Sequence, residues 1–387
     1  MTEAEGRQED LARLAHPFGP GSALPARRGA MRPTPLLLQG QDYFFRSPDT
    51  DLDFQDRMYR ADLVSDGSVD PVPCVLVLAR AADMEMNELS LALAEHNIRM
   101  VRVDADRCLD LALTVYTDAP LIEFQRWLLR PLLVWRRHFD ITAVPVDPTT
   151  VHGAYVREQW QAVANWLACR SDWEQVNPVR SSEHLDRLTQ LHDAAAFGLR
   201  VPRTAVTTMP GRTRPGGGRC IVKTAGHHLL EPEPGALRGL FPRPLDIRRT
   251  HEALEPAPVL VQQYLDAEYE LRVFVVGERV IPFRVEKLDP AQLWVDPEAV
   301  AVSRVEIDAA LADKMLALCR HWKLQVAAFD LLVIRGEPVF LEVNVNCDWR
   351  WFEHRAECTE VSDGVHGWVR ARFGELAAVA AASRDRW

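Results

Sequence analysis

The sequence predicts a mixed fold, in which an α/β region with a parallel sheet precedes an α+β region of antiparallel hairpins and helices. Two observations support this prediction. Between residues 73 and 104 a buried-type strand, a helix and a second strand follow one another, which is the order of a parallel βαβ unit. Beyond residue 177, apolar β-branched runs come in pairs joined by short turns and alternate with helical segments.

In the α/β region, the period of the apolar residues identifies each element. Short apolar runs predict buried strands, and the spacing of Met86, Leu89 and Leu93 predicts a helix. The predicted elements are strands at 74–79, 100–104 and 132–137, and helices at 86–96 and 154–169. The third strand ends in Arg136 and Arg137.

The α+β region begins with a helix at 183–197, which Gly198 ends. Predicted strands follow at 220–223, 259–264, 270–276 and 280–283, then a helix at 308–321 and a hairpin at 329–334 and 339–346. Residues 1 to 72 have Pro/Gly clusters and weak periodicity, so we expect a flexible or partner-dependent extension there.

Composition excludes several classes of protein. The 387 residues carry a formal net charge of −10, which argues against nonspecific binding to nucleic acid or acidic membranes. The sequence shows no signal peptide and no apolar stretch of about 18 residues, the length of a membrane-spanning helix. Its seven cysteines form no Cys-x-x-Cys pair, so neither a disulfide framework nor a zinc site is predicted. We therefore expect a cytoplasmic protein.

The C-terminal hairpin carries the polar side chains that point most directly to chemistry. Glu342, Asn344 and Asn346 alternate along its second strand and share one face. A three-residue turn at 335–337 places Asp330 opposite Glu342, and two facing carboxylates repel each other. A cation between them is therefore expected, and oxygen ligands without Cys or His favour Mg²⁺. The alternative is a hairpin with one solvated polar face.

Charged side chains also end two other predicted strands. Lys223 ends a buried-type strand and can pair with phosphate as a point charge. Glu270 and Arg272 share a face, where a carboxylate can accept both hydroxyls of a ribose and an arginine can bind a phosphoryl group. On the residues alone, a solvated lysine and a surface ion pair remain open as alternatives. No Walker A or Gly-x-Gly-x-x-Gly pattern is present.

In this order the segments resemble the ATP-grasp ligases, in which two α+β subdomains hold ATP. The residues that carry this likeness are Lys223, Gln262-Gln263-Tyr264, Glu270-x-Arg272, Asp330 and Glu342-x-Asn344. Within the superfamily, the sequence is most similar to the ATP-grasp maturases of ribosomally made peptides, the graspetide or microviridin-type ligases. Four segments carry this closer likeness: Val134-Trp135-Arg136-Arg137, Trp173-x-x-Val176-Asn177-Pro178, Gly198-x-x-Val201-Pro202-Arg203-Thr204 and the run from Glu342 to Trp351.

The resemblance implies an ATP-grasp fold with a parallel βαβ pre-ATP-grasp domain on its N-terminal side. The expected divisions are an extension at 1–72, the pre-ATP-grasp domain at 73–176, a central subdomain at 177–258 and a C-terminal subdomain at 259–387. The implied roles are as follows: Arg187 and Lys223 hold the ATP phosphates, Gln262, Gln263 and Tyr264 meet adenine, Glu270 holds ribose, Arg272 stabilises the acyl phosphate, and Asp330, Glu342 and Asn344 bind two Mg²⁺ ions.

The expected function is that of an ATP-dependent carboxylate ligase acting on a precursor peptide. Asp or Glu side chains of the peptide would be activated as acyl phosphates, and Ser, Thr or Lys side chains would close ester or amide rings, with ADP and phosphate as products. Arg136 and Arg137 are the expected contacts for the leader of the peptide, although a structural pair is the alternative. The resemblance also implies a homodimer, and no nucleic-acid or membrane partner is expected.

Three positions depart from the pattern of the family. Arg187 stands where the family has a phosphate-contacting lysine, Thr224 replaces the usual Pro after Lys223, and Val345 lies where a Pro is frequent. A guanidinium keeps the charge of an ammonium but changes its geometry. Two other functions therefore stay open: a free-standing ligase of amino acids or small peptides, and a nucleotide-binding partner protein without turnover.

Overall fold

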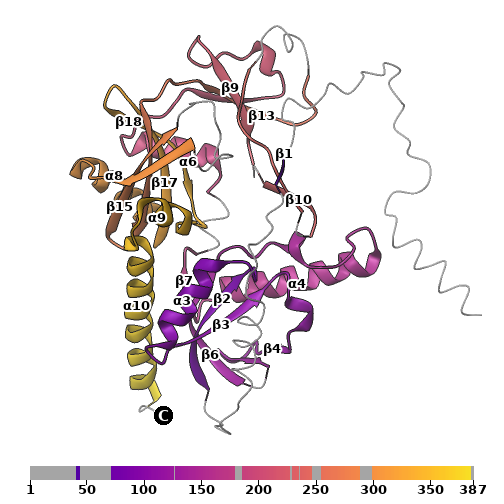
Figure 1. Ribbon diagram of the computed structural model, residues 1–387. Coiled ribbons are helices and arrows are strands. Elements are labelled where there is room, and N and C mark those ends of the chain that lie inside the picture. Colours follow the sequence, from indigo (N-terminus) through magenta and orange to yellow (C-terminus); the bar gives the residue numbers. More distant parts are fainter. Residues whose placement is uncertain are drawn as a thin grey trace, which may run out of the picture. The chain divides into compact units, whose positions relative to one another are not determined.

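The computed structural model describes residues 41–43, 71–125, 127–178, 185–226, 229–234, 236–245, 254–287 and 299–384. Within these residues the chain forms four β-sheets and the helices that pack on them (Figure 1). None of the helices in this part of the chain is both long and apolar enough to cross a membrane. Most of the expected extension at 1–72 lies outside the described residues.

The N-terminal domain, residues 71–176, contains the predicted parallel βαβ unit. Its sheet has the order β3-β2-β6-β5-β4, with β7 beside β6. The strands are β2 (Val72–Ala79), β3 (Arg99–Asp104), β4 (Leu113–Val115), β5 (Ile122–Phe124), β6 (Trp127–Arg136) and β7 (Glu174–Val176). The helices are α3 (Met84–Ala94), η1 (Cys108–Asp110), η2 (Ile141–Ala143) and α4 (Val151–Cys169).

Four strands of this sheet, β3, β2, β6 and β7, run parallel, which confirms the predicted α/β class. The antiparallel strands β4 and β5 were not predicted, because three-residue strands carry too little periodicity to be recognised in a sequence. Residues 74–79 of β2 are fully buried. Burial on both faces explains why β2 reads as an unbroken apolar run instead of an alternating pattern.

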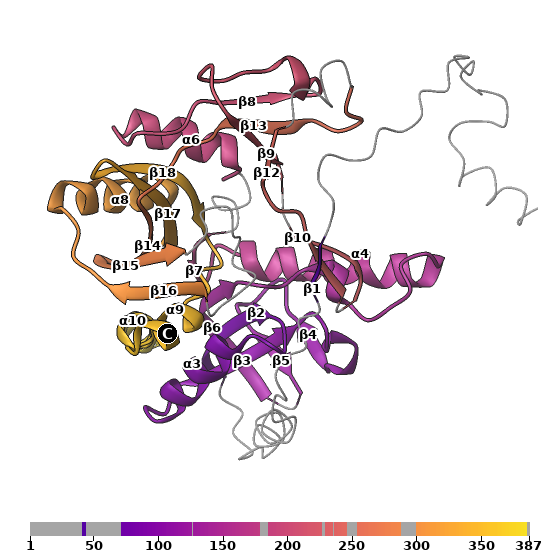
Figure 2. The same ribbon diagram turned by 45° about the horizontal axis from the view of Figure 1, so that its top comes forward.

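The central sheet has the order β12-β9-β13-β8 and is antiparallel throughout. Its strands are β8 (Thr204–Thr207), β9 (Cys220–Thr224), β12 (Arg243–Pro244) and β13 (Val259–Gln263), with η3 (Pro210–Arg212) between the first two. A separate sheet joins β1 (Gln41–Tyr43), β11 (Ala236–Gly239) and β10 (Leu229–Glu233). Figure 2 shows β8, β9 and β13 together above the C-terminal strands.

The start of the C-terminal subdomain and the start of the first helix of the α+β region are among the boundaries that differ from the sequence prediction. The last segment was expected to begin at residue 259, but β13 pairs with β8 and β9 and therefore belongs to the central sheet. The sequence of an apolar strand does not indicate which sheet the strand joins. Helix α6 (Arg187–Ala196) starts later than the predicted 183, because the Asp186 side chain accepts from the N–H groups of Leu188 and Thr189 and so caps the helix.

The C-terminal sheet has the order β16-β15-β14-β17-β18 and is also antiparallel. Its strands are β14 (Tyr269–Val276), β15 (Arg279–Lys287), β16 (Val300–Arg304), β17 (Val326–Ile334) and β18 (Glu337–Asn344). Its helices are α8 (Ala309–Trp322), α9 (Arg350–Ala356) and α10 (Glu360–Arg384).

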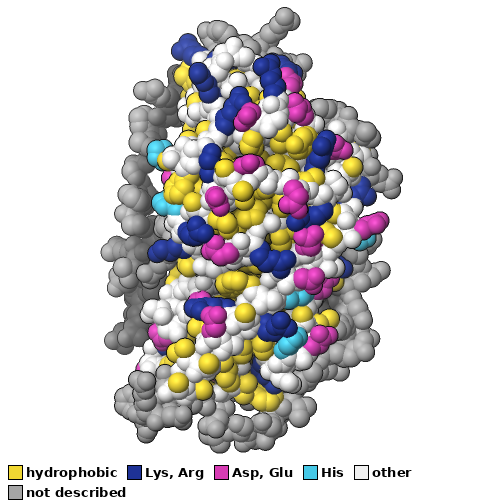
Figure 3. All heavy atoms as spheres, turned by 90° about the vertical axis from the view of Figure 1, so that its left-hand side faces the viewer, with side chains coloured by type: hydrophobic (Ala, Val, Ile, Leu, Met, Phe, Trp, Pro, Cys, Tyr) yellow, Lys and Arg dark blue, Asp and Glu magenta, His cyan; other side chains and the backbone are white. Residues whose placement is uncertain are grey.

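On the face seen in Figure 3, Lys and Arg side chains alternate with Asp and Glu side chains, and no continuous basic area covers its described part.

The two faces of β14 pack against different partners. Leu271, Val273 and Val275 share a core with α8, whereas Phe274 and Val276 share a core with α10 and the N-terminal domain. Side chains alternate along a strand, so Glu270 and Arg272 lie on the same face as Phe274. This alternation directs the polar end of β14 toward the N-terminal domain side of the sheet.

The β17–β18 hairpin reaches its expected pairing by a different route from the one predicted. The turn is formed by two residues, Arg335 and Gly336, which have φ values of 53° and 74°. Positive φ at both positions is typical of a type I′ turn. A two-residue turn alone would place Leu341 opposite Asp330, but the register shifts by one residue between Asp330 and Leu331. This bulge brings Glu342 opposite Asp330, so the predicted pairing is confirmed and the predicted three-residue turn is wrong.

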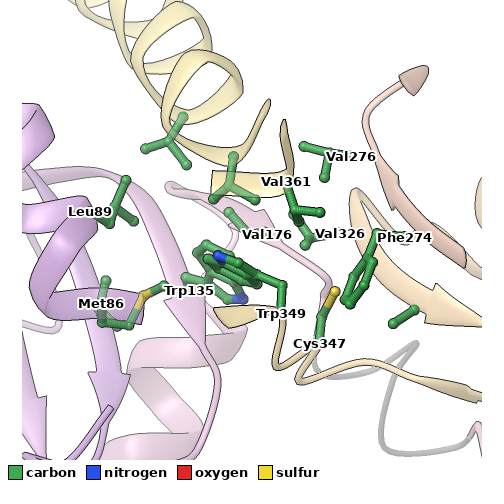
Figure 4. Close-up of a cluster of buried hydrophobic side chains, with 14 of the residues drawn as sticks. Met86, Leu89, Trp135, Val176, Phe274, Val276, Val326, Cys347, Trp349 and Val361 are labelled. Atoms are coloured by element: carbon green, nitrogen blue, oxygen red, sulfur yellow. The ribbon is translucent and has the colours of Figure 1, made fainter. Parts of the chain in front are cut away.

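One hydrophobic core joins the N-terminal domain to the C-terminal sheet. It combines residues of β2, α3 and β6 with residues of β14, β15, α9 and α10. In Figure 4, Trp135 of β6 and Trp349, which precedes α9, lie side by side at its centre. Helix α10 contacts α3 and β6 as well as β14 and β15. The two parts therefore share buried apolar surface.

Candidate nucleotide site

Charged side chains converge where the C-terminal sheet meets β9 and the start of α6. Arg272 of β14 pairs with Asp330 of β17, and Asp330 pairs in turn with Glu342 of β18. This register sets Arg272, Asp330 and Glu342 in a single row across three neighbouring strands, with Asp330 in the middle. The convergence involves Lys223 of β9 and Arg187 of α6, both of which interact electrostatically with Glu342.

Arg272 and Asp330 are neighbours in this row, and Arg272 is buried. Arg272 Nη1 lies 2.8 Å from both carboxylate oxygens of Asp330. Asn344 Nδ2 donates to Asp330 Oδ2 at 2.7 Å, which leaves the amide oxygen of Asn344 as a possible cation ligand. Burial raises the pKa of Asp330 above its ordinary value, although the charge of Arg272 opposes this. The guanidinium also lies 5.1 Å from the ring centroid of Phe352.

Arg187 connects the second carboxylate to the loop after β9. Its Nε donates to Glu342 Oε2 at 2.8 Å. Its Nη1 donates to the hydroxyl of Thr224 at 2.8 Å and to the carbonyl oxygens of Thr224 and Gly226 at 2.9 and 3.0 Å. The two departures from the family pattern, Arg187 and Thr224, are therefore in direct contact. A guanidinium has more N–H donors than an ammonium, and here one of them donates to the Thr224 hydroxyl, an acceptor that a proline at this position would not provide.

Lys223 and Lys287 complete the positive charge of the site. Burial lowers the pKa of Lys223, while the carboxylates of Glu342, Asp330 and Glu270 act in the opposite direction. Lys287 Nζ lies 2.7 Å from Glu270 Oε1, and its side chain is only 8% exposed. Sequence reasoning missed Lys287, although it ends an apolar strand just as Lys223 does.

The charge balance of this group suits an anionic ligand. Four cations, Arg187, Lys223, Arg272 and Lys287, face the three carboxylates of Glu270, Asp330 and Glu342. One positive charge is left over. In this structure Arg272 pairs with Asp330 and Arg187 pairs with Glu342, while the Mg²⁺ ion expected between the two carboxylates stays a prediction.

The predicted ligand set fits magnesium in its chemistry. Asp330, Glu342 and Asn344 offer oxygen atoms, and Mg²⁺ prefers carboxylate, amide and water oxygens. Among the described residues no group of three or more His, Cys, Asp and Glu side chains is arranged to hold a metal ion. The set here is two carboxylates and one amide, so it depends on Asn344 as its third member. The metal roles of these residues stay a prediction.

The segment expected to meet adenine lies at the end of β13. Gln262 is buried, and its Nε2 donates to Thr204 Oγ1 at 2.9 Å. The backbone N–H groups of Gln263 and Tyr264 already donate to the carbonyl oxygens of Arg203 and Arg219, each at 2.8 Å. These N–H groups are therefore already paired within the protein, and the adenine contact of this segment stays a prediction.

The two arginines expected to contact a leader have different environments. The side chain of Arg137 is 0% exposed and forms ion pairs with Asp83, Glu85 and Asp348. A buried guanidinium held by three carboxylates cannot contact a peptide at the surface, so this prediction is wrong for Arg137. Arg136 is half-buried and donates to Asn165 Oδ1 at 3.0 Å. Its predicted role stays open.

Comparisons with known proteins agree with this geometry. No protein-family model matches the chain, and no curated protein sequence matches it. Solved structures do. The macrocyclase MdnC of Microcystis aeruginosa MRC, bound with its precursor peptide MdnA, has a TM-score of 0.66 and 17% identity, covering 77% of this chain and 99% of MdnC.

Two further structures extend the comparison. The ATP-grasp ligase PsnB, complexed with a minimal precursor, Mg and ADP, has a TM-score of 0.63 and 19% identity, covering 77% of this chain and 97% of PsnB. The D-cycloserine synthetase DcsG has a TM-score of 0.50 and 16% identity, covering 78% of this chain and 99% of DcsG. The architecture and these matches define the fold as an ATP-grasp fold with a parallel N-terminal domain. Its structure is similar to those of a macrocyclase bound with its precursor peptide and of an ATP-grasp ligase complexed with a minimal precursor.

Proposed function

We propose that this protein is an ATP-dependent carboxylate ligase that modifies a ribosomally made precursor peptide. The observation that carries the proposal is the row Arg272, Asp330 and Glu342 across three strands, with Lys223 and Arg187 beside it. These residues come from separate parts of the chain, and their charges sum to a site that favours a polyanion. The similarity to MdnC and PsnB, which were solved with precursor peptides, supports a peptide substrate.

In the proposed first step, a carboxylate of the peptide attacks the γ-phosphorus of ATP, and ADP leaves. Lys223 and Arg187 bind the phosphates, and Arg272 stabilises the charge on the group that is transferred. Glu270 accepts hydrogen bonds from the ribose hydroxyls after its ion pair with Lys287 has opened. Mg²⁺ held by Asp330, Glu342 and Asn344 would neutralise phosphate charge, and the family resemblance suggests two ions. The product of this step is an acyl phosphate.

In the proposed second step, a hydroxyl or amine of the same peptide attacks the acyl phosphate. Negative charge develops on the carbonyl oxygen, and a buried guanidinium such as Arg272 is suited to stabilise it. The result is an ester or amide ring and free phosphate. The homodimer and the leader contact at Arg136 belong to this proposal too, as do the domain limits other than the one at residue 259.

The test combines the purified protein with Mg²⁺, ATP and a synthetic peptide rich in Thr, Asp and Glu that is encoded beside its gene. Mass spectrometry is expected to show a loss of about 18 Da for each ring, because each closure through an activated acyl group removes one water overall. ATP binding without any mass loss would contradict the ligase proposal and favour a nucleotide-binding partner protein. The direct contact of Arg187 with Thr224 argues against that outcome, since the two departures support each other.

The second candidate function is a free-standing ligase of amino acids or small peptides. The structural similarity to DcsG, a small-molecule synthetase, favours it. Incubation with Mg²⁺, ATP and a mixture of free amino acids separates the two functions. Phosphate release that depends on free amino acids, without any change in the peptide, would support this candidate over the peptide maturase.

A further inference from the structure

A second group of titratable side chains lies beside the candidate nucleotide site, between the end of β6 and the segment after β18. His138 Nε2 lies 2.8 Å from Asp348 Oδ1. Arg137 Nη2 lies 2.7 Å from the same oxygen. Asp348 therefore connects an imidazole and a guanidinium of the N-terminal domain to the segment that continues from Asn344.

This segment contacts the Arg272–Asp330 pair at both of its ends. At its start, Asn344 Nδ2 donates to Asp330 at 2.7 Å. At its end, the Phe352 ring centroid lies 5.1 Å from Arg272 Cζ. Burial lowers the pKa of Arg272, but the charges of Asp330 and, more weakly, Asp348 raise it above its ordinary value. Asp348 is thus within electrostatic reach of the group that would stabilise the acyl phosphate.

The His138–Asp348 pair is open to solvent. The side chains of His138 and Asp348 are 27% and 64% exposed. When the imidazole Nε2–H donates to Asp348, Nδ1 carries the lone pair. A carboxylate that fixes the tautomer and orientation of a histidine is the arrangement by which many enzymes form a proton acceptor.

The groups around His138 set its basicity. Burial lowers the pKa of His138, but the carboxylate of Asp348 raises it overall above the usual value; Arg137 opposes this and Asp83 reinforces it. Glu85 reaches the same cluster through Arg137, at 3.6 Å. Arg80 Nε donates to the backbone carbonyl of His138 at 3.2 Å. Each of these groups contributes charge or position to the imidazole.

The proposed ring closure releases a proton that the residues assigned so far do not accept. Arg187, Lys223 and Arg272 are assigned to the phosphates and the transferred group, Lys287 pairs with Glu270, and the carboxylates are assigned to metal and ribose. Resting on the proposed function, we infer that His138, oriented by Asp348, accepts the proton of the attacking hydroxyl or amine. The oxygen or nitrogen of the attacking group bonds to the acyl carbon, the carbon–oxygen bond to phosphate breaks, and phosphate leaves with the electron pair. The proton passes to His138 Nδ1 and then to water.

The test separates the two steps with hydroxylamine, which traps an acyl phosphate as a hydroxamate without needing a protein base. His138→Gln keeps an amide donor toward Asp348. We expect it to lower ring closure about 100-fold, a typical contribution of general base catalysis, and to leave hydroxamate formation within about twofold of wild type. His321→Gln is the matched control, because His321 also pairs with an aspartate, Asp193, but lies on α8. It should change neither rate.

The pH profile provides a readout that a purely structural role would not change. In wild type, ring closure should rise with pH through the pKa of His138, because only the neutral imidazole accepts a proton. Asp348→Asn should move this limb to lower pH, since it removes the charge that raises the pKa. Normal ring closure in His138→Gln with an unchanged profile would overturn the inference alone. If wild type forms no hydroxamate from Mg²⁺, ATP and the peptide, the proposed function itself fails, and this inference fails with it.

Discussion

Arg187 and Thr224 show how the meaning of single residues depends on their neighbours. Each departs from the pattern of the ATP-grasp maturases, and each departure taken alone suggests a weaker phosphate site. In the structure the Arg187 guanidinium bridges Glu342 and the Thr224 hydroxyl. We therefore expect the two departures to compensate each other in phosphate binding, because a guanidinium N–H of Arg187 donates to the hydroxyl that Thr224 adds.

A double-mutant cycle tests this compensation. Thr224→Val removes the hydroxyl but keeps the shape of the side chain, and Arg187→Lys keeps the charge but removes the guanidinium whose Nη1 donates to Thr224. We expect each single change to weaken binding of Mg-ATP, with a coupling energy of about 1 kcal/mol, roughly fivefold in Kd. Titration calorimetry measures the four affinities. Additive effects of the two changes would show that the contact does not matter for nucleotide binding.

Glu342 tests the metal assignment. Glu342→Gln keeps the volume of the side chain but removes a charged oxygen ligand. We expect ATP turnover to fall by at least about 100-fold, because phosphate charge is then neutralised less well. The melting temperature should change by only a few degrees, since Glu342 is not deeply buried. Glu337→Gln, at the exposed start of the same strand, is the control for both measurements. Near-normal turnover of Glu342→Gln would remove Glu342 from the metal site.

At the scale of elements, the β17–β18 hairpin decides whether the carboxylates face each other. Its register depends on two irregular features, a two-residue turn and a bulge after Phe340. Moving a strand by one residue reverses the face of every side chain. Loss of the bulge would thus turn Glu342 away from Asp330 without changing the turn.

The turn makes its own prediction. Arg335 has a φ of 53°, which is unfavourable for a residue with a long side chain and acceptable for asparagine. Arg335→Asn is therefore expected to raise the free energy of unfolding by about 0.5–1 kcal/mol. Gly336→Ala should lower it by about 1 kcal/mol, because φ is 74° there. Urea denaturation measures both changes. A destabilising Arg335→Asn would contradict the type I′ assignment.

At the scale of the whole molecule, the N-terminal domain and the C-terminal sheet are connected by both apolar and ionic contacts. Trp135 and Trp349 lie in one core (Figure 4), and the Arg137 guanidinium lies 4.6 Å from the ring centroid of Trp349. Arg137 stays charged although burial acts to lower its pKa, because Asp83, Asp348 and Glu85 raise it. The connection fixes the segment that carries Asp348.

Arg137→Leu is expected to lower the free energy of unfolding by about 3–5 kcal/mol, because it leaves buried carboxylates without their partner. Arg136→Leu is the matched control from the same strand end, and its half-buried side chain predicts a loss below about 1 kcal/mol. Thermal and urea unfolding of the two variants give the comparison. Equal stability of both variants would mean that the ionic contacts of Arg137 do not hold the two parts together.

Several parts of the fold and the site could be predicted from the sequence. The parallel βαβ unit was predicted because β2, α3 and β3 each have a strong period of apolar residues. The pairing of Asp330 with Glu342 was predicted from a three-residue turn; the turn has two residues, and the bulge after Phe340 restores the predicted pairing. The short strands β4 and β5 were missed, because three residues have no clear period. The membership of β13 in the central sheet was missed, because pairing partners are distant in sequence.

The sequence by itself determined the fold class, because periodicity is a local property of the chain, and the ordered series from Lys223 to Asn344 predicted the residues of the candidate nucleotide site. Only the tertiary structure decided what each charge does. Arg137 was expected at a peptide surface and is buried among carboxylates, while Lys287, His138 and Asp348 gained importance from their neighbours. Burial and ion pairing depend on contacts between residues far apart in the chain, so local sequence patterns do not predict them.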